Sequence, residues 1–213
     1  ADDQALLNQV VGYYHETLKQ SPEALAYLRH RGLESAEMID HFKIGFANRT
    51  LGLRLPMKNR AAGADIRARL TALGIFRESG HEHMSGSVTF PILDEAGNTV
   101  GLYGRKITES LPSRCPRHLY LPGPHRGVWN VGALAASKEI VLCESLIDAL
   151  SFLCAGFRNV TSAYGVQGFT DEILATMKRH GTERVLIAYD RDAAGDKAAA
   201  ELAPRLAEAG IDV

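Results

Sequence analysis

The sequence predicts an α+β N-terminal subdomain followed by an α/β domain with a parallel sheet flanked by helices. Over residues 6–18, apolar side chains recur at the spacing of one helical face, and alternating apolar residues before a turn near residue 95, with a second strand after it, indicate a β-hairpin. From residue 139, short apolar strands alternate with helices, which is typical of a parallel sheet. We therefore expect one subdomain over residues 1–137 and the α/β domain over residues 138–213.

The composition excludes several classes of protein. Of the 213 residues, 46% are hydrophobic and 23% are charged, which is ordinary for a globular chain. No apolar run approaches the roughly 18 residues of a membrane span, and the first residues lack the pattern of a signal peptide. The three cysteines (Cys115, Cys143 and Cys154) have no metal-ligand spacing. We expect a reduced, cytoplasmic chain without a disulfide framework or a zinc ribbon.

The first elements are helices. Leu6, Val10 and Tyr14 lie on one face of a predicted helix that extends to Leu18. Ser21 and Pro22 are typical of a helix start, and the helix that follows is expected to end before Gly32. A short helix is predicted over residues 35–42.

The next segment changes to the period of a strand. Val88, Phe90 and Ile92 alternate, residues 94–98 have the composition of a turn, and residues 99–107 continue as a second strand. Residues 108–127 are rich in Pro, Gly and Arg, so we expect a loop there.

The C-terminal part is the most regular. It has predicted strands at 139–143, 159–163 and 184–189, with predicted helices at 145–155, 170–180 and 193–209. Ligands of such sheets bind beyond the carboxyl ends of the strands. The residues that follow each strand are therefore the first candidates for a functional site.

Acidic residues occupy two of these strand ends. Glu144 follows the first strand, Asp190 and Asp192 follow the third, and Asp148 lies one helical turn after Glu144. Carboxylates packed closely repel one another, and Mg²⁺ is a natural counter-charge. The alternative is that each acid only caps a helix N-terminus. Three acids at two adjacent strand ends favour a metal site.

Charge divides unevenly along the chain. Residues 1–138 have a net charge of +4, with 17 basic and 13 acidic residues, whereas residues 139–213 have a net charge of −5. Two basic stretches lie at residues 54–77 (Arg54, Lys58, Arg60, Arg67, Arg69 and Arg77) and residues 101–126 (Arg105, Lys106, Arg114, Arg117 and Arg126). They are either solvated surface or a phosphate-binding half joined to an acidic, metal-binding half.

Two motifs in the C-terminal part resemble those of the TOPRIM domain, which bacterial primases share with type IA and type II topoisomerases. Residues 141–150, with Glu144 and Asp148, resemble its first motif, and residues 189–199 resemble its Asp-x-Asp motif. Residues 163–168 match the glycine turn after the second strand. The trailing Gly195-x-x-Ala198 favours the primase branch.

The resemblance extends upstream to the polymerase core of DnaG-type primases. Residues 26–33 and 41–47 are similar to the opening of that core, and residues 90–105 are similar to its hairpin with a basic residue. Residues 117–122 lie where the family has Lys-Tyr-Leu-Asn-Ser-Pro, and residues 125–127 match the segment that follows. Several motifs in the right order carry this resemblance.

The resemblance implies DNA-templated synthesis of short RNA primers by metal-dependent nucleotidyl transfer. Glu144, Asp190 and Asp192 would be catalytic and, with Asp148, would hold two ions of Mg²⁺ or Mn²⁺. Phosphates of nucleotide and template would be bound by six further residues, namely Arg105, Lys106, Arg117, His118, Arg126 and Lys197. The implied partners are single-stranded DNA, ribonucleoside triphosphates and, through regions outside this chain, a replicative helicase at the nucleoid.

The sequence departs from the family pattern at several points. Arg191 replaces the usual glycine inside Asp-x-Asp, Asp196 replaces a common basic residue, and Arg117 replaces lysine. The sequence has no Cys/His zinc module ahead of the polymerase core. It also stops before the acidic Asp-x-Asp segment that usually follows this core in the family. We therefore expect an excised core truncated at its C-terminus, or the core of a mobile-element or phage primase, without zinc.

Two other functions stay open at this point. A TOPRIM nuclease or topoisomerase would use the same metals for strand cleavage, and an adaptor would only bind single-stranded DNA. There is no P-loop. His81, Glu82 and His83 form a weak metal candidate without a further partner. Cys143 is interpreted as a core residue, and Trp129 as packing rather than as a base-stacking platform.

Overall fold

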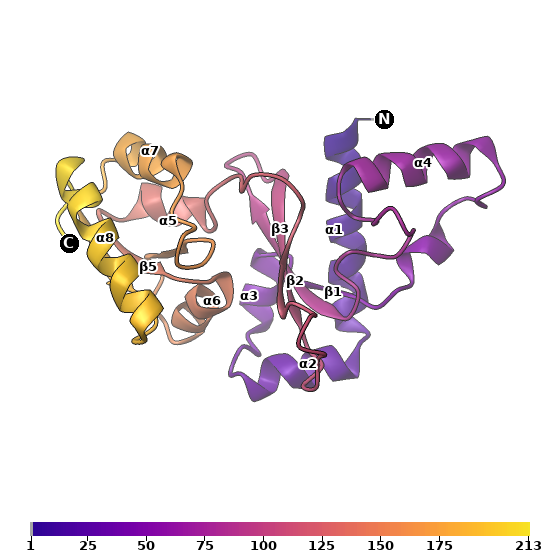
Figure 1. The fold of residues 1–213 in the computed structure, drawn as a ribbon, viewed down its shortest axis with the longest axis horizontal. Coiled ribbons are helices and arrows are strands. Elements are labelled where there is room, and N and C mark those ends of the chain that lie inside the picture. The colour runs from indigo at the N-terminus through magenta and orange to yellow at the C-terminus, as the bar shows by residue number, and fades with distance from the viewer. Residues whose placement is uncertain (1) are drawn as a thin grey trace. The chain divides into compact units, whose positions relative to one another are not determined.

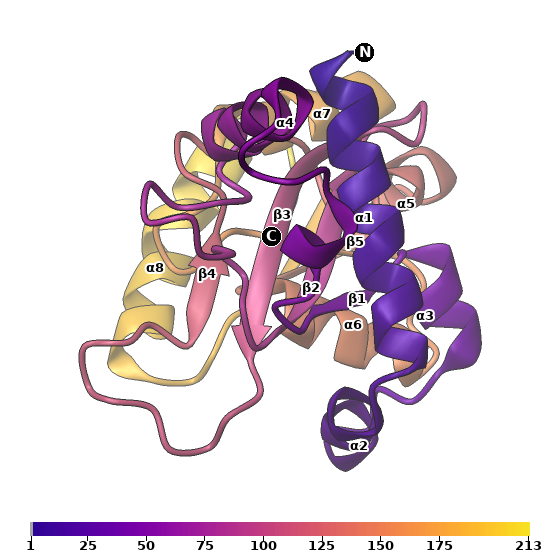
Figure 2. The same ribbon diagram turned by 90° about the vertical axis from the view of Figure 1, so that its right-hand side faces the viewer.

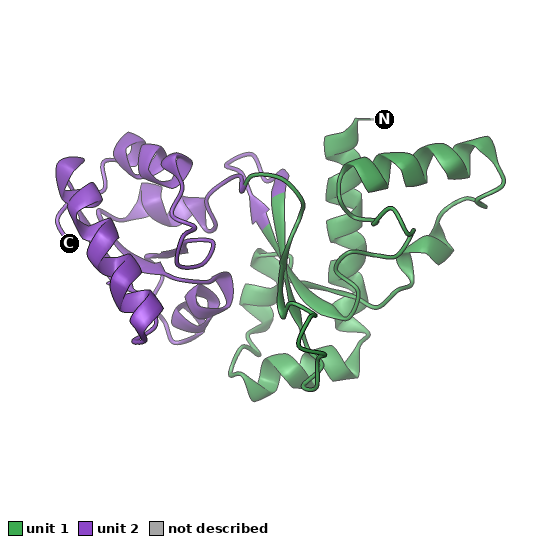
Figure 3. Ribbon diagram, viewed as in Figure 1, with its two compact units in different colours: residues 1–91, 101–124 green, residues 92–100, 125–213 purple. Residues whose placement is uncertain are grey.

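The computed structural model describes residues 2–213, and its helices and strands are labelled in Figure 1. The chain forms two compact units. Unit 1 comprises the residues up to 91 together with 101–124, and unit 2 comprises residues 92–100 and 125–213 (Figure 3). The tip of the central hairpin therefore belongs to unit 2. The boundary between residues 137 and 138, which was drawn from sequence pattern alone, stays a prediction.

Unit 1 begins with the three helices that the sequence predicts. These are α1 (Asp3–Lys19), α2 (Pro22–His30) and α3 (Ala36–His41). The side chain of Asp2 caps α1 by accepting from the backbone N–H of Gln4, and Ser35 caps α3 in the same way. Pro22 is the first residue of α2, where its missing N–H costs no hydrogen bond.

The sheet of unit 1 has the strand order β1-β2-β3-β4. Its strands are β1 (Gly45–Ala47), β2 (Ser87–Leu93), β3 (Thr99–Lys106) and β4 (His118–Tyr120). The hairpin formed by β2 and β3 is confirmed. The loop predicted over residues 108–127 is wrong at β4, which pairs antiparallel with β3 and places Arg105 opposite His118. A strand of three residues is too short to give a period-two signal, so its pairing is decided by β3.

The core of unit 1 lies between α1 and this sheet. Helix α1 lies across the sheet and packs against β1 (Figure 2). Leu6, Val10 and Tyr14 of α1 are buried together with Leu102 of β3 and Leu119 of β4. Two elements that the sequence did not predict complete the unit, namely the 3₁₀ helix η1 (Leu51–Arg54) and α4 (Ala61–Ala72).

Unit 2 is built on a parallel three-stranded sheet with the order β6-β5-β7. Its strands are β5 (Glu139–Cys143), β6 (Val160–Ser162) and β7 (Arg184–Ala188), and its helices are α5 (Val131–Ala136), α6 (Leu146–Cys154), α7 (Asp171–His180) and α8 (Ala193–Glu208). Apart from the short α5, each element was predicted. The predicted fold class, an α+β part followed by an α/β part, is confirmed.

Helix caps fix the turns that follow the strands. Ser145, Thr170 and Asp192 each accept a backbone N–H at the start of a helix, and Gly181 ends α7 with a φ of 69°. Because β5 pairs with β7 from Glu139 to Cys143, both strands deliver their following residues to the same sheet edge. Among residues 2–213, no helix is long and apolar enough to cross a membrane.

Candidate active site

Glu144 and Asp190 meet at the carboxyl ends of β5 and β7. The last paired residues of these strands are Cys143 and Ala188, so Glu144 follows its strand directly and Asp190 comes two residues after its own. The backbone N–H of Asp190 donates to Oε2 of Glu144 over 3.4 Å. The Glu144 side chain therefore reaches across from its own strand to the end of the neighbouring strand.

The charge of Glu144 is opposed by three aspartates. Partial burial raises the pKa of Glu144, and the negative charges of Asp190, Asp192 and Asp148 raise it further. The N–H of Asp190 acts in the opposite direction. The three aspartates therefore lie near enough to Glu144 for their charges to act on its carboxylate.

Two of these acids also serve helix N-termini. Oδ1 of Asp192 accepts from the N–H of Gly195 over 2.8 Å, so Asp192 caps α8. In α6, the hydroxyl of the cap residue Ser145 donates to Oδ2 of Asp148, whose own N–H donates to that hydroxyl over 3.4 Å. Asp192 is therefore a helix cap, as one interpretation predicted. It caps α8 and, at the same time, its charge acts on Glu144.

The donor chemistry fits a hard divalent cation with water among its ligands. Within residues 2–213, no three His, Cys, Asp or Glu side chains are already arranged around one metal position. The carboxylates offer oxygen donors, however, and Asp190 and Asp192 are exposed to water. Mg²⁺ usually binds through one or two carboxylates and keeps several waters, so a closed protein cage is not required.

Close backbone packing holds the Asp-x-Asp segment in place. A Cβ on Gly195 would stand 2.1 Å from the carbonyl oxygen of Asp190, so no larger residue fits without movement. On the other side, the N–H of Gly165 in the glycine turn donates to the carbonyl oxygen of Glu144 over 2.9 Å. Glu144 therefore contacts both other motifs of unit 2, the glycine turn through its carbonyl oxygen and the Asp-x-Asp segment through its side chain.

Burial disfavours the reactive, deprotonated forms of Cys143 and Tyr189. Burial raises the pKa of the Cys143 thiol to about 12, and burial together with the Glu144 charge raises the pKa of Tyr189 to about 12. The interpretation of Cys143 as a core residue is confirmed. Tyr189, which separates β7 from Asp190, is buried as well.

Arg191 and Asp196, two departures from the family pattern, form an ion pair. Nε of Arg191 lies 2.9 Å from Oδ1 of Asp196.

Of the predicted phosphate-binding residues of unit 2, Lys197 lies on α8 with its Nζ 3.8 Å from Glu201. Arg126 has an exposed side chain, and its carbonyl oxygen accepts from the Tyr164 hydroxyl over 2.9 Å.

Arg105 and His118, both predicted site residues, are in contact in unit 1. The Arg105 guanidinium donates to the His118 ring and, over 3.3 Å, to the hydroxyl of Tyr27. The hydroxyl of Tyr103 lies 2.7 Å from Nδ1 of His118. The contacts of Arg105 with His118 and Tyr27 are thus to aromatic side chains and not to a carboxylate.

Lys106 belongs to a cluster of three cations around the turn at Ser85. Its Nζ donates to the carbonyl oxygen of Ser85, and Nε of Arg49 donates to the Ser85 hydroxyl over 2.7 Å. Burial lowers the pKa of Lys106, and the charges of Arg77 and Arg49 lower it further. Arg49 has a left-handed φ of 68°, which is uncommon for arginine. Sequence analysis missed Arg49 because no spacing connects it with Arg77 and Lys106.

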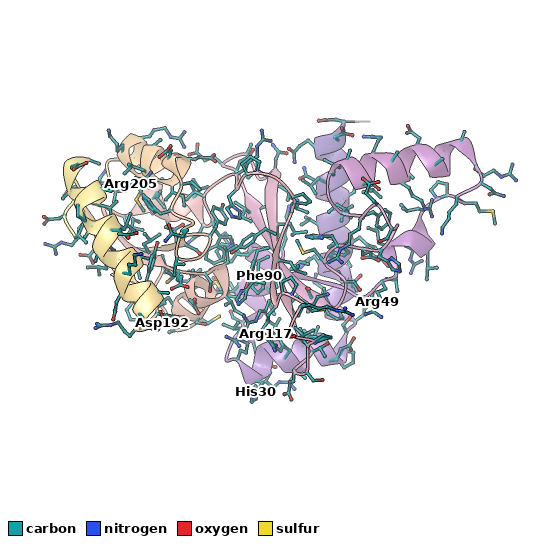
Figure 4. The ribbon with its side chains drawn as sticks, in the orientation of Figure 1. His30, Arg49, Phe90, Arg117, Asp192 and Arg205 are labelled. Atoms are coloured by element: carbon teal, nitrogen blue, oxygen red, sulfur yellow. The ribbon has the colours of Figure 1, made fainter. Side chains whose placement is uncertain are left out.

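The loop between β3 and β4 is stabilised by Arg117. Its guanidinium donates to the carbonyl oxygens of Thr108 and Glu109 over 3.1 and 3.0 Å. Figure 4 labels Arg117 and Arg49, both on unit 1. Arg117 therefore orders the loop as well as adding positive charge to it.

The remaining sequence candidates have structural partners. His81 contacts Ser79 and His83 contacts the carbonyl oxygen of Tyr120, whereas Glu82 is buried between Tyr14 and Leu51. These three side chains therefore point to different partners. Trp129 is only 1% exposed, which confirms that it packs in the core.

Family models match both parts of the chain. The model described as "DNA primase catalytic core, N-terminal domain" matches residues 13–116, and the model described as "Toprim-like" matches residues 141–213. A DNA primase from Campylobacter jejuni is 27% identical over 98% of this chain and 35% of its own length. The chain spans about a third of the length of the primases it matches.

Solved structures share the fold. The Aquifex aeolicus primase with its zinc-binding and RNA polymerase domains is 24% identical, with a TM-score of 0.81 over 98% of this chain and 53% of that one. A DnaG primase catalytic domain bound to single-stranded DNA is also 24% identical, with a TM-score of 0.77 over 96% of this chain and 68% of that one.

Proposed function

Because this chain belongs to the bacterial DnaG-type primase family, we propose that it is the polymerising core of an enzyme that copies single-stranded DNA into short RNA primers. The observation that carries this proposal is the meeting of Glu144 and Asp190 at two adjacent strand ends, where the N–H of Asp190 donates to Oε2 of Glu144 and where Asp192 and Asp148 add negative charge. A cluster of this kind is stabilised by divalent cations, and nucleotidyl transfer is chemistry that such cations support.

Glu144, Asp190 and Asp192 are the proposed catalytic ligands, and Asp148 supports them from α6. When bound, a pair of Mg²⁺ or Mn²⁺ ions supplies charge stabilisation at the attacking 3′-hydroxyl and at the leaving pyrophosphate. The protein holds the carboxylates in place through the cap at Asp192 and the close approach of Gly195 to Asp190. The exposure of Asp190 and Asp192 leaves room for waters and for phosphate oxygens.

The cations of unit 1 are the proposed phosphate contacts. Arg105, with His118 beside it, and the cluster of Lys106, Arg49 and Arg77 would bind the backbone of the template and the phosphates of nucleotides. Three cations that repel one another around the Ser85 turn favour an anionic ligand. Arg117, Arg126 and Lys197 are proposed as further phosphate contacts. The copied bases would be selected by pairing, so the chain needs no base-reading side chains.

The proposed partners follow from the same chemistry. A relative has been solved with single-stranded DNA bound, which supports a single-stranded template here. Ribonucleoside triphosphates are the proposed substrates, and a replicative helicase is the proposed partner through regions outside this chain. The proposed place of action is the replication fork at the nucleoid.

Primer synthesis can be tested directly. The protein is incubated with a single-stranded template, labelled ribonucleoside triphosphates and either Mg²⁺ or Mn²⁺, and the products are separated by size. We expect template-dependent oligoribonucleotides that are lost when EDTA is added. Glu144→Gln and Asp190→Asn should abolish them, whereas Glu201→Gln, a change on the exposed part of α8, should not.

The same reactions distinguish the alternatives. Cleaved DNA without RNA products would indicate a nuclease or topoisomerase, and retention of the template without either product would indicate an adaptor. Either outcome would contradict the proposed synthesis.

A further inference from the structure

The segment formed by η1 and the turn into α4, residues 51–60, presents apolar side chains to water. Leu53 is 82% exposed and Met57 is 69% exposed, and they are the two most exposed large hydrophobic residues in the described part of the chain. Single exposed apolar residues are common on protein surfaces. Two within five positions, on one ordered segment, call for a physical explanation.

Hydrogen bonds fix the backbone of this segment. The Arg67 guanidinium donates to the carbonyl oxygens of Gly52, Pro56 and Gly63 over 3.1, 2.5 and 3.0 Å. Helix α4 also approaches closely, because a Cβ on Gly63 would stand 2.0 Å from the carbonyl oxygen of Met57. The segment is therefore held in a shape that keeps Leu53 and Met57 outward.

Uncompensated positive charge surrounds these side chains. Arg54, Lys58 and Arg60 are exposed, and none of them forms an ion pair with a carboxylate in residues 2–213. The Arg67 guanidinium donates to backbone carbonyl oxygens, and Arg69 of the same basic stretch forms an ion pair with Asp3 over 2.6 Å. Apart from Arg77, which belongs to the Lys106 cluster, the basic stretch at residues 54–77 thus divides into two structural cations and three without a carboxylate partner, next to Leu53 and Met57.

A groove leads from this segment along α1. It has a volume of about 580 Å³, and Leu53 and Arg54 form one wall. Its other lining residues are mainly uncharged groups that form hydrogen bonds, among them Thr17, Gln20 and Asn48. The acid of the lining, Glu16, is paired with Lys19 over 3.1 Å. Such side chains suit the N–H and C=O groups of an extended peptide.

We propose that residues 51–60 and this groove form a docking site for an acidic, apolar peptide segment of a partner protein. Aliphatic side chains of the peptide contact Leu53 and Met57, its carboxylates pair with Arg54, Lys58 and Arg60, and its backbone lies along the groove. A nucleic acid matches the charge but not the apolar surface, because residues 51–60 contain no aromatic side chain on which a base can stack. The aromatic residue of the groove, Tyr13, is half-buried, and its hydroxyl is hydrogen-bonded to Thr50.

The test uses fluorescence anisotropy with four labelled probes and no synthesis reaction. The first is a peptide of about ten residues composed of Asp, Glu, Leu and Ile, the length that an extended chain needs to span the segment and the groove. The second has Lys in place of the acids, the third has Ser in place of Leu and Ile, and the fourth is an oligo(dT) strand. We expect the first peptide to bind most tightly, because it is the only probe with both acids for the cations of the site and aliphatic side chains for Leu53 and Met57.

Two variants and two matched controls locate the binding. The pair Leu53→Ser with Met57→Ser, and the pair Arg54→Glu with Lys58→Glu, should each weaken binding of the first peptide at least about tenfold. Phe157→Ser and Lys178→Glu change an exposed apolar residue and an exposed cation of unit 2, and they should leave it unchanged. Circular dichroism verifies that each variant is folded.

Three outcomes would overturn the docking site. The first peptide could fail to bind up to about 1 mM, a weak limit for any specific complex. It could bind the Leu53→Ser with Met57→Ser variant as tightly as the unchanged protein. Alternatively, oligo(dT) could be the probe whose affinity falls in that variant. None of these results bears on primer synthesis, which is measured separately.

Discussion

The carbonyl oxygen of Asp190 lies where a side chain on Gly195 would begin, because a Cβ there would stand only 2.1 Å away. The first turn of α8 is therefore built directly on the backbone of an acid in the candidate site. This contact gives a physical reason for the glycine in the motif and places Gly195 among the residues that position the cluster.

Gly195→Ala should disturb both stability and the acidic cluster. The added methyl group must push α8 away from Asp190, which should lower the free energy of unfolding by roughly 1–3 kcal/mol, as overpacking does. Primer synthesis should fall further than the loss of folded protein explains. Gly12→Ala is the control, because Gly12 lies in α1 with no atom within 4 Å of its Cβ position. That change should raise stability by about 0.5–1 kcal/mol, measured by urea unfolding.

Asn substitutions at Asp190 and Asp192 should remove synthesis and preserve the fold. Both residues are exposed, and Asn at position 192 still caps α8, so the free energy of unfolding should stay within about 0.5 kcal/mol. Synthesis should fall at least about a hundredfold because metal ligands are lost. Product yield in a primer-extension assay provides the measurement.

Asp196→Asn is the control for these two variants. It removes a nearby carboxylate that binds Arg191 and is outside the proposed ligand set. If Asp190→Asn or Asp192→Asn retained the synthesis rate of this control, the substituted residue would not be a catalytic ligand.

Arg105→Ala and Lys106→Ala should weaken single-stranded DNA binding in a salt-dependent way. Each removes a proposed phosphate contact, so the slope of log affinity against log salt should decrease by about 0.7 per residue. Arg49→Gln should have a similar effect through the cluster around Ser85. The change should be nearly independent of DNA sequence, because phosphate contacts do not read bases. Filter binding at four salt concentrations measures it.

Arg205 is the matched cation for this titration. It lies on α8, where Figure 4 labels it, and donates to the carbonyl oxygen of Phe169 over 3.1 Å. Arg205→Ala should change neither the slope nor the affinity. Unit 1 cations that behaved in the same way would place the template path elsewhere.

Glu82 should make the stability of unit 1 depend on pH. Burial raises the pKa of this carboxyl, although the hydrogen bonds from Tyr14 and Leu51 and the charge of Arg49 oppose the shift. The folded state therefore keeps a proton on Glu82 that the unfolded state has already lost. As the pH rises from the ordinary value of about 4.3 through the raised pKa, the free energy of unfolding should decrease and then level off.

Glu82→Gln should remove this contribution. The amide has the same shape and can still accept from the N–H of Leu51. Urea unfolding of both proteins from about pH 4 to about pH 8 should give a stability difference that changes with pH. Curves that run parallel over the whole range would falsify the assignment to Glu82.

The fold of unit 2 could be predicted from sequence because its signals are local. Apolar runs give β5 and β7, and Ser145, Thr170 and Asp192 give the helix starts. The missed elements have weak local signals. Helix α4 buries only Gly63 and Leu70, so its apolar face is almost absent, and β4 has three residues.

The candidate site likewise has a part that the sequence predicts and a part that it does not. Glu144 and Asp190 follow strands, so parallel pairing was enough to predict that they meet. The cluster of Arg49, Arg77 and Lys106 brings together three segments of unit 1 that are far apart in sequence, and no sequence period encodes such a convergence. The distinction between structural and free cations in residues 54–77 likewise required the carbonyl partners of Arg67.

The ion pair of Arg191 with Asp196 couples the charges of these two positions. Glycine at position 191 alone would leave the Asp196 carboxylate without this cationic partner. A basic residue at position 196 alone would bring two cations together within the same turn. A lineage that exchanged this arrangement for the common family pattern would therefore pass through an intermediate of altered charge, whichever substitution came first.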